Sequence, residues 1–565
     1  MSAHSYRRLR IAVGALVLAF CTLAFADVPD WISAPAARIG LWFQFTPSLL
    51  SLTQGIGWLS LGCLAVLALT LLVGRVYCSM LCPLGILMDL SAWLAGRTGR
   101  NRKLPYKPGK TTIRIAAVAI CTVGLALGTA VPLGLLDPYS IFGKIVTATI
   151  RPLAGWTNQL ISQTGLTQPY DFSPVAWATA GVALGLLALI VITAIFRGRL
   201  WCNTACPVGA ILGFFSKFSL FRLHISSSQC VACSLCERTC PAQCIDFKNH
   251  RIDHSRCIMC LNCVTSCKRN GIHLTTGKLD RGLQSAPTSE PIPHLQSSIH
   301  DPLAKPLPRR AILGASLAIP AAALAEKHQG NGPGNGKGRG NASGQGIGGG
   351  QAQGHGNGHG NGHDPKYSCS GPNRLTQFNK TPSLPPGAKS LRHFQSHCTA
   401  CQLCVANCPE QVLRPSITKH GLAGFLQPYQ DFEVSFCSFN CSNCSDVCPT
   451  GAIQPLTIED RQHVQTGVAQ LFRSRCVVKT EGTSCGACAE HCPTGAVHMV
   501  PWKNGLTIPE VDPDLCVGCG GCEFICPVRP DKAIIVVGHT THQKAKLPEL
   551  GDQNTVRKIE EEFPF

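Results

Sequence analysis

Cysteine is the residue whose number and spacing in this chain point to chemistry: 33 of the 565 residues are Cys. Most of them fall in runs with two or three residues between successive Cys, such as Cys230–Pro241 and Cys257–Lys268. Thiolates at this spacing hold iron–sulfur clusters, whereas zinc ribbons use paired Cys without the four-Cys run. Disulfides, the usual alternative in a small secreted chain, do not explain the regular runs. The runs therefore predict [4Fe–4S] clusters that transfer electrons.

In two-cluster ferredoxins each run gives three ligands to one cluster and its fourth Cys to the partner cluster. This rule assigns 24 Cys to six predicted clusters, although the runs beginning at Cys437 and Cys476 have a wider first gap. The predicted ligand sets are Cys230, Cys233, Cys236 with Cys267; Cys257, Cys260, Cys263 with Cys240; Cys398, Cys401, Cys404 with Cys448; Cys437, Cys441, Cys444 with Cys408; Cys476, Cys485, Cys488 with Cys526; and Cys516, Cys519, Cys522 with Cys492. Short apolar stretches after the runs (GAIQPL, GAVHMV and AIIVV) are predicted to be strands.

A second pattern occurs twice, as GRVYCSMLCPLG at 74–85 and GRLWCNTACPVG at 198–209. Each copy follows an apolar hairpin, so the membrane part is predicted to be a duplicated unit that brings the two thiol pairs to equivalent depths. Four thiolates suit an iron–sulfur cluster or another soft metal, and two separate pairs suit dithiol redox chemistry. The alternative is that they are buried packing thiols. The proposed redox motif of the membrane domain consists of Cys78, Cys82, Cys202 and Cys206.

Long apolar segments must position this motif. The four predicted membrane spans are Ile11–Ala26, Leu49–Val73, Ile115–Leu136 and Val175–Phe196. Lys and Arg concentrate before the first span and after the second and fourth, so the positive-inside rule places the N-terminus and both Cys-x3-Cys-Pro motifs in the cytoplasm. The first ferredoxin module follows the last span closely and is also predicted to be cytoplasmic.

A further apolar stretch determines on which side of the membrane the remaining modules are predicted to lie. Arg309 and Arg310 precede Ala311–Ala325, which has the features of a twin-arginine signal that exports folded proteins, or of a fifth membrane segment. A Gly-, Asn- and His-rich linker follows. We expect the C-terminal modules to be periplasmic. The alternative is a surface helix here, with everything after it in the cytoplasm.

The predicted fold class is an α-helical membrane domain of four spans, with a candidate fifth, plus small α+β ferredoxin-like domains. The predicted domains are the membrane domain at 1–222, a cytoplasmic two-cluster module at 223–280, the signal region at 281–326, the linker at 327–390, two-cluster modules at 391–455 and 456–545, and a tail at 546–565.

Charge and missing motifs exclude other classes. The net charge of +19 comes largely from residues that flank apolar segments, which argues for a lipid bilayer rather than nucleic acid as the partner. No His lies between His4 and His224 and no Cys-x-x-Cys-His occurs, so no haem is expected. Walker and dinucleotide-binding motifs are absent from the sequence. The Cys that fit no run are interpreted as structural or incidental: Cys21, Cys63, Cys121, Cys244 and Cys369.

With these features in place, the chain resembles a fusion of two subunits of the quinol dehydrogenase that serves periplasmic nitrate reductase. Residues 1–280 resemble the NapH-type membrane subunit and residues 305–540 the NapG-type ferredoxin. The resemblance implies a protein of the bacterial inner membrane that passes electrons from quinol to a periplasmic reductase or its electron-carrier subunit. Two alternatives are an assembly factor for the metal centre of a respiratory enzyme, and a cytoplasm-facing carrier from ferredoxin to the membrane.

Overall fold

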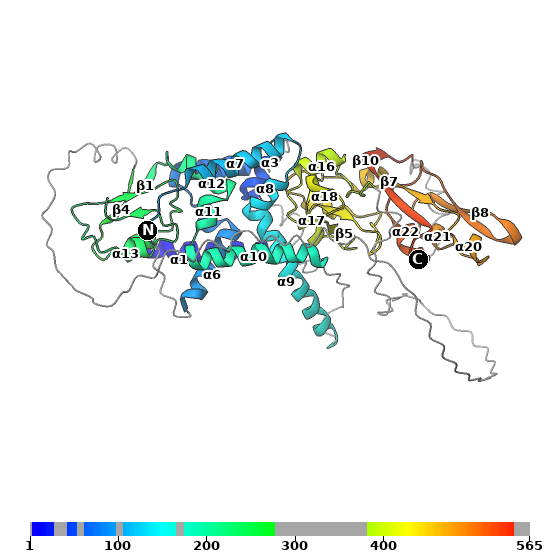
Figure 1. Ribbon diagram of the computed structural model, residues 1–565, viewed down its shortest axis with the longest axis horizontal. Coiled ribbons are helices and arrows are strands. Elements are labelled where there is room, and N and C mark those ends of the chain that lie inside the picture. Colours follow the sequence, from blue (N-terminus) through cyan, green and yellow to red (C-terminus); the bar gives the residue numbers. More distant parts are fainter. Residues whose placement is uncertain are drawn as a thin grey trace, which may run out of the picture. The chain divides into compact units, whose positions relative to one another are not determined.

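The computed structural model describes residues 3–26, 42–53, 61–97, 105–164, 175–276 and 381–546 (Figure 1). The predicted twin-arginine stretch, most of the linker and Cys369 lie outside these residues. Two described helices are long and apolar enough to cross a membrane, namely α1 (Ala3–Ala26) and α10 (Trp177–Arg197). They correspond to the first and fourth predicted spans, and α1 begins eight residues earlier than the apolar run at Ile11 suggested.

The second and third predicted spans are not continuous helices of membrane length. The second consists of α3 (Phe45–Thr53) and α4 (Leu61–Val73), and the third of α7 (Thr111–Ala126) and α8 (Val131–Leu136). Gly128 ends α7 with φ +81, and the Thr129 amide donates to the Gly124 carbonyl at 2.9 Å, as in a Schellman cap. The predicted four spans are thus corrected to two candidate spans among the described helices.

Several helices have no long apolar run and were not predicted. In each copy of the duplicated unit, a short helix carries the first Cys of the motif and a longer one starts at its Pro. These helices are α5 (Tyr77–Met80), α6 (Pro83–Arg97), α11 (Leu200–Thr204) and α12 (Pro207–Ser216). The long helix α9 (Pro138–Ser162) is amphipathic, and the side chain of its N-cap Asp137 accepts from the Ser140 amide.

The first soluble module is a small antiparallel structure around two short helices. Strand β1 (Phe221–Ile225) pairs with β4 (Ile272–Thr276), so that Leu223 lies opposite Leu274. The remaining elements are α13 (Leu235–Arg238), β2 (Ile245–Asp246), β3 (Arg251–Ile252) and α14 (Asn262–Ser266). Strands β2 and β3 pair with each other, as the hairpin of a ferredoxin module requires.

The C-terminal modules repeat this pattern. The first contains α16 (Leu391–His397), α17 (Leu403–Ala406), β5 (Leu413–Pro415), η2 (Leu422–Gly424), β6 (Pro428–Gln430) and α18 (Asn443–Val447). The second contains α19 (Ile458–His463), β7 (Val464–Leu471), α20 (Val477–Thr480), α21 (Ala487–Glu490), β8 (Val497–Pro501), η3 (Lys503–Gly505), β9 (Thr507–Val511), α22 (Gly521–Ile525) and β10 (Ile534–Lys544). The antiparallel pairs are β5 with β6, β8 with β9, and β7 with β10.

Two of the three predicted strands are confirmed, because GAVHMV contains most of β8 and AIIVV leads into β10. The prediction for GAIQPL at 451–456 is wrong. No strand forms there, and the Gln454 amide instead donates to the Gly387 carbonyl at 2.9 Å.

Candidate functional site

The two Cys-x3-Cys-Pro motifs come together in the helical domain. Cys78, Cys82, Cys202 and Cys206 are each at most 5% exposed and belong to one buried core. Cys82 and Cys206 both lie within electrostatic range of Cys202 and Cys78. The structure therefore brings together the quartet that the duplicated sequence predicted. Its chemistry stays a prediction.

Two buried arginines, one from each copy of the Cys-x3-Cys-Pro motif, donate hydrogen bonds to the other copy. The sequence analysis did not predict this exchange. Arg75, from the first motif, donates to the Cys202 carbonyl at 3.1 Å. Arg199, from the second motif, donates to the Cys78 carbonyl. The guanidinium of Arg75 also lies 3.6 Å from the Cys78 sulfur. The shared Gly-Arg pair before each motif was the signal that could have revealed this exchange.

The glycines that close the motifs leave room for these arginines. A Cβ on Gly85 would lie 2.6 Å from Nη1 of Arg199, and one on Gly209 would lie 2.9 Å from Nη2 of Arg75. The Gly85 amide donates to the Cys82 sulfur at 3.4 Å, and the Gly209 amide reaches the Cys206 sulfur at 3.3 Å. Each second Cys therefore has a backbone donor that stabilises negative charge on its sulfur.

Positive charge exceeds negative charge around the quartet. Asp89 accepts from Arg199 at 2.6 Å and lies 3.7 Å from Arg10. Arg75 instead donates to the Asn203 side chain and the Ser255 carbonyl, both at 3.0 Å. Cations close to Cys favour the thiolate, which is the form that binds metals and reacts in thiol exchange.

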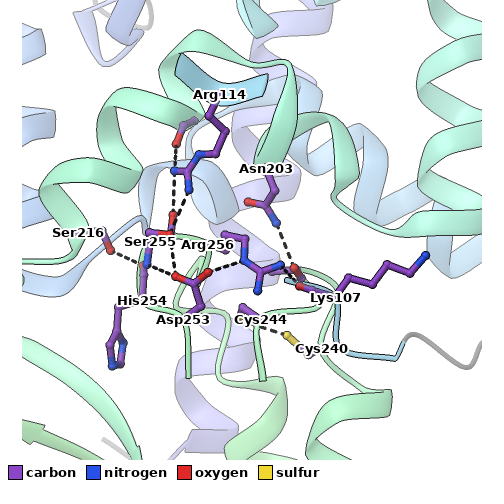
Figure 2. A network of polar contacts seen from close by, with 12 residues as sticks. Lys107, Arg114, Asn203, Ser216, Cys240, Cys244, Asp253, His254, Ser255 and Arg256 are labelled. Atoms are coloured by element: carbon purple, nitrogen blue, oxygen red, sulfur yellow. Dashed lines mark hydrogen bonds and ion pairs between the residues drawn. The ribbon is translucent and has the colours of Figure 1, made fainter. Parts of the chain in front are cut away.

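A loop of the first ferredoxin module is fixed to the helical domain beside this site (Figure 2). Arg114 of α7 donates to the Ser255 hydroxyl at 3.0 Å, and Ser216 of α12 donates to the His254 carbonyl at 2.9 Å. Arg256 pairs with Asp253 at 2.6 Å. Cys257 follows this loop directly, and Cys260 packs in the same core as the quartet.

Both predicted ligand sets of this first module form groups in space. A cavity of about 190 Å³ is lined by Cys230, Cys233, Cys236 and Cys267. A second, narrow cavity is lined by Cys240, Cys257, Cys260 and Cys263. Cys244 also lines the second cavity, with its sulfur 3.5 Å from that of Cys240. The interpretation of Cys244 as incidental missed this position.

The cysteines of the two C-terminal modules form the groups in space that the runs predicted. Cys408, Cys437, Cys441 and Cys444 line one cavity. Electrostatic neighbours define three further groups: Cys398, Cys401, Cys404 and Cys448; Cys476, Cys485, Cys488 and Cys526; and Cys492, Cys516, Cys519 and Cys522. Within the described ranges, no three His, Cys, Asp or Glu side chains are placed to hold a single metal ion. In a [4Fe–4S] cluster each thiolate binds a different iron.

Burial disfavours the thiolate form of the grouped cysteines. Burial raises the pKa of Cys236 to about 11 and that of Cys488 to about 12, because a thiolate is poorly solvated there. A bound cation offsets this cost, since a coordinating thiol gives up its proton to the metal.

The C-terminal groups lie in a row. Cys404 neighbours Cys444, and Cys522 neighbours Cys488. Between the two modules, the Cys437 amide donates to the Cys519 carbonyl at 2.8 Å. The run spacing could not predict this last contact, because it joins Cys of different modules.

The first group of the row lies against helices α1 and α9. Lys144 of α9 is 1% exposed, and its Nζ donates to the Gly134 carbonyl at 2.8 Å and to the Thr399 carbonyl at 3.4 Å. Asn407 donates to the Ala24 carbonyl at the end of α1, at 3.3 Å. At the other end of α1, the Tyr6 hydroxyl donates to the Met259 carbonyl of the first module at 3.1 Å.

Comparison with known families agrees with these groups. A model described as a 4Fe-4S binding domain matches twice, at 54–101 and 179–226, which covers both Cys-x3-Cys-Pro motifs and supports the duplication. Two models described as 4Fe-4S dicluster domains match at 397–453 and 482–529. The protein is therefore an iron–sulfur, ferredoxin-type electron-transfer protein with multiple [4Fe–4S] clusters. No solved structure matches the chain.

Several curated proteins are similar to parts of the chain. The methylamine utilization ferredoxin-type protein MauN of Paracoccus denitrificans is 30% identical over 43% of this chain and 77% of its own length. MauM of Methylobacillus flagellatus is 35% identical over 27% of this chain and 67% of its own. The ferredoxin-type protein NapF of Escherichia coli is 28% identical over 27% of this chain and 86% of its own length. The chain spans 55% of the length of an uncharacterized Methanocaldococcus jannaschii protein. The chain thus belongs to the family of ferredoxin-type 4Fe–4S proteins that includes MauN and MauM.

Proposed function

We propose that this protein is a membrane-anchored iron–sulfur conduit that takes electrons from membrane quinol and passes them to a periplasmic reductase, such as nitrate reductase, or to its electron carrier. The observation that carries the proposal is the pair of contacts made by α1. Tyr6, near its start, bonds to the first ferredoxin module, and Ala24, near its end, bonds to the C-terminal module.

The length of α1 makes these contacts informative. A helix of 24 residues is about 36 Å long, and the hydrocarbon core of a bilayer is about 30 Å thick. If α1 spans the bilayer, its two ends contact ferredoxin modules on opposite sides. This arrangement supports a cytoplasmic first module and periplasmic C-terminal modules.

The row of Cys groups supplies the route for electrons. It begins at the group of Cys398 beside α1 and α9 and continues through the contact between Cys437 and Cys519. The 24 predicted ligands would hold six [4Fe–4S] clusters, two in the first module and four in the C-terminal modules. Within each of these soluble parts, neighbouring clusters would form a continuous route. We infer that the far end of the row, in the module at 456–545, faces the electron acceptor.

The quartet of Cys78, Cys82, Cys202 and Cys206 is the proposed crossing point between the first module and the helical domain. It is buried among membrane helices, shares a core with Cys260, and is linked through Arg75 to the Ser255 carbonyl. An iron–sulfur cluster, another soft metal or two dithiol pairs all remain compatible with its thiols and cations.

One experiment tests this function on the purified full chain. Quinol is added anaerobically, and electron paramagnetic resonance follows the reduction of the clusters. We expect quinol to reduce clusters in both soluble parts. In a Cys78→Ser/Cys82→Ser variant, quinol should no longer reduce clusters of the first module, while dithionite still does. Cys63→Ser, in the same buried core but outside the motif, serves as the matched control. Unchanged kinetics in the double variant would contradict the role of the quartet.

A reporter fusion tests the topology separately. A periplasm-dependent reporter placed after residue 390 should be active. Activity only from a cytoplasmic reporter at the same position would favour the alternative of a carrier that faces the cytoplasm throughout.

A further inference from the structure

We propose that a cavity between the end of α7 and helix α16 binds the head group of quinol, with His393 as the acceptor of its hydroxyl protons. The inference rests on the proposed function and deepens it, because it places the entry of electrons next to the Cys398 group. The cavity has a volume of about 560 Å³, within the range of about 300–1,000 Å³ typical of small-molecule sites.

The two walls of the cavity differ in chemistry. One wall is apolar and comes from two helices of the helical domain, with Leu50 of α3 and Leu125 and Ala126 of α7. The other wall is polar and includes His393 and His397 of α16. A quinol has the same division, with an apolar ring and tail and two hydroxyl groups.

The outer surface of α7 offers a path for the tail of the substrate. Ile115, Ile120 and Val123 are 64%, 56% and 56% exposed, and Leu127 at the end of the helix is 79% exposed. In a membrane protein such a stripe faces lipid. The stripe leads to the end of α7 that lines the cavity, so a lipid-dissolved substrate can enter without crossing water.

The tautomer of His393 is fixed by its backbone partner. Nε2 of His393 lies 3.1 Å from the Gly451 carbonyl. A carbonyl only accepts, so Nε2 carries the hydrogen and Nδ1 carries a lone pair. The ring of His397 stacks on that of His393 with centroids 4.4 Å apart, and its Nδ1 lies 2.9 Å from the His393 carbonyl and 2.8 Å from the Ser396 hydroxyl. His393 therefore offers a lone pair that can accept a hydrogen bond from a quinol hydroxyl.

The polar wall leads directly to a predicted cluster ligand. His397 is the last residue of α16, and the next residue, Cys398, donates its amide to the Phe394 carbonyl at 2.8 Å. Cys398 is buried and belongs to the group with Cys401, Cys404 and Cys448. One step along the backbone therefore separates the wall of the cavity from a predicted cluster ligand.

The reaction balances with these partners. Oxidation of one quinol breaks two O–H bonds and releases two protons and two electrons. The two protons leave one after the other through His393 to water at the open side of the cavity. A [4Fe–4S] cluster held by the Cys398 group would take up the two electrons one at a time, with the next cluster of the row as its oxidant.

Binding of a quinol analogue tests the site without relying on turnover. Fluorescence quenching of 2-heptyl-4-hydroxyquinoline N-oxide is titrated against the purified full-length protein with its clusters. Leu125→Trp fills the cavity and should weaken binding at least about tenfold. Ile115→Trp adds the same bulk to the lipid-facing part of α7 and should leave binding unchanged. Equal binding to Leu125→Trp and wild type would overturn the proposal.

A histidine variant separates proton transfer from binding. His393→Gln should retain analogue binding within about threefold but slow quinol oxidation at least about tenfold, while dithionite reduction is unaffected. His498→Gln, at an exposed position of β8, is the matched control. A wild-type rate of quinol oxidation in His393→Gln would contradict the role of His393.

Labelling of the wild-type protein with a photoreactive azidoquinone tests the site without any variant that could misfold. Labelled peptides should come from the end of α7 and from α16, and labelling confined to other helices would overturn the site. If labelling maps here but quinol fails to reduce the clusters, the proposed function fails and the binding site stands. If quinol reduces the clusters but labelling maps elsewhere, only this inference fails.

Discussion

Gly143→Ala should separate the C-terminal module from helices α1 and α9 without replacing any predicted ligand. A Cβ at Gly143 would overlap the Cys401 carbonyl and lie 2.7 Å from Cε1 of Phe25, at the contact of α9 with α1 and the Cys398 group. The clash involves backbone on one side and a packed ring on the other, so neither neighbour can yield freely.

The expected cost follows from this geometry. Overpacking of a close-packed contact typically costs about 1–3 kcal/mol, and about 1.4 kcal/mol changes an equilibrium tenfold. A Gly→Ala change within a helix by itself stabilises by about 0.5–1 kcal/mol. Gly143→Ala should therefore reduce the ratio of docked to undocked module by a few-fold to roughly a hundredfold.

Hydrogen exchange of the full chain measures this ratio. Amides at 398–407 should exchange faster in Gly143→Ala by the same factor, whereas those of the quartet helices stay protected. Gly181→Ala in α10, where an added Cβ meets nothing within 4 Å, is the control and should change neither region. Unchanged protection at 398–407 in Gly143→Ala would refute the docking of this module on α9.

Three further predictions concern charge, pH and ligand identity. Arg199→Lys loses the paired contacts to Asp89 and should lower stability by at least about 1 kcal/mol in chemical denaturation, with Arg251→Lys unchanged as an exposed control. Burial lowers the pKa of His420 to about 4, so between pH 6.5 and pH 4 the unfolded chain binds a proton that the folded chain does not, and stability should fall as the pH is lowered through this range. His420→Phe should flatten this part of the plot of melting temperature against pH. An unchanged slope in this variant would contradict the prediction. Cys240→Ser should lose about four iron atoms per chain, whereas Cys244→Ser should lose none; equal losses would show that the ligand set is misassigned.

The ligand groups could be predicted from the sequence because cluster binding depends on local spacing. Cys233 and Cys236 stand at fixed offsets from Cys230 in one tight loop, and the more distant Cys267 completes the group in the structure as the two-run rule predicted. The meeting of the two membrane motifs was also predictable, since a duplicated unit places Cys78 and Cys202 at equivalent positions.

Other features depend on contacts between distant parts of the chain. Nothing in the local sequence shows that Arg75 donates to the carbonyl of Cys202, or that the backbone amide of Cys437 donates to the backbone carbonyl of Cys519. The break after α7 was missed because hydropathy does not register a left-handed Gly128. The cavity was missed because its apolar wall and its histidines lie more than 250 residues apart in sequence.

Iron counting combined with anaerobic electron paramagnetic resonance during a quinol titration tests the central claim most directly. Six clusters of four irons predict about 24 iron atoms per chain and signals from reduced [4Fe–4S] clusters that appear as quinol is added. Protein that contains little iron, that holds zinc in its place, or whose clusters respond to dithionite but never to quinol would contradict the account.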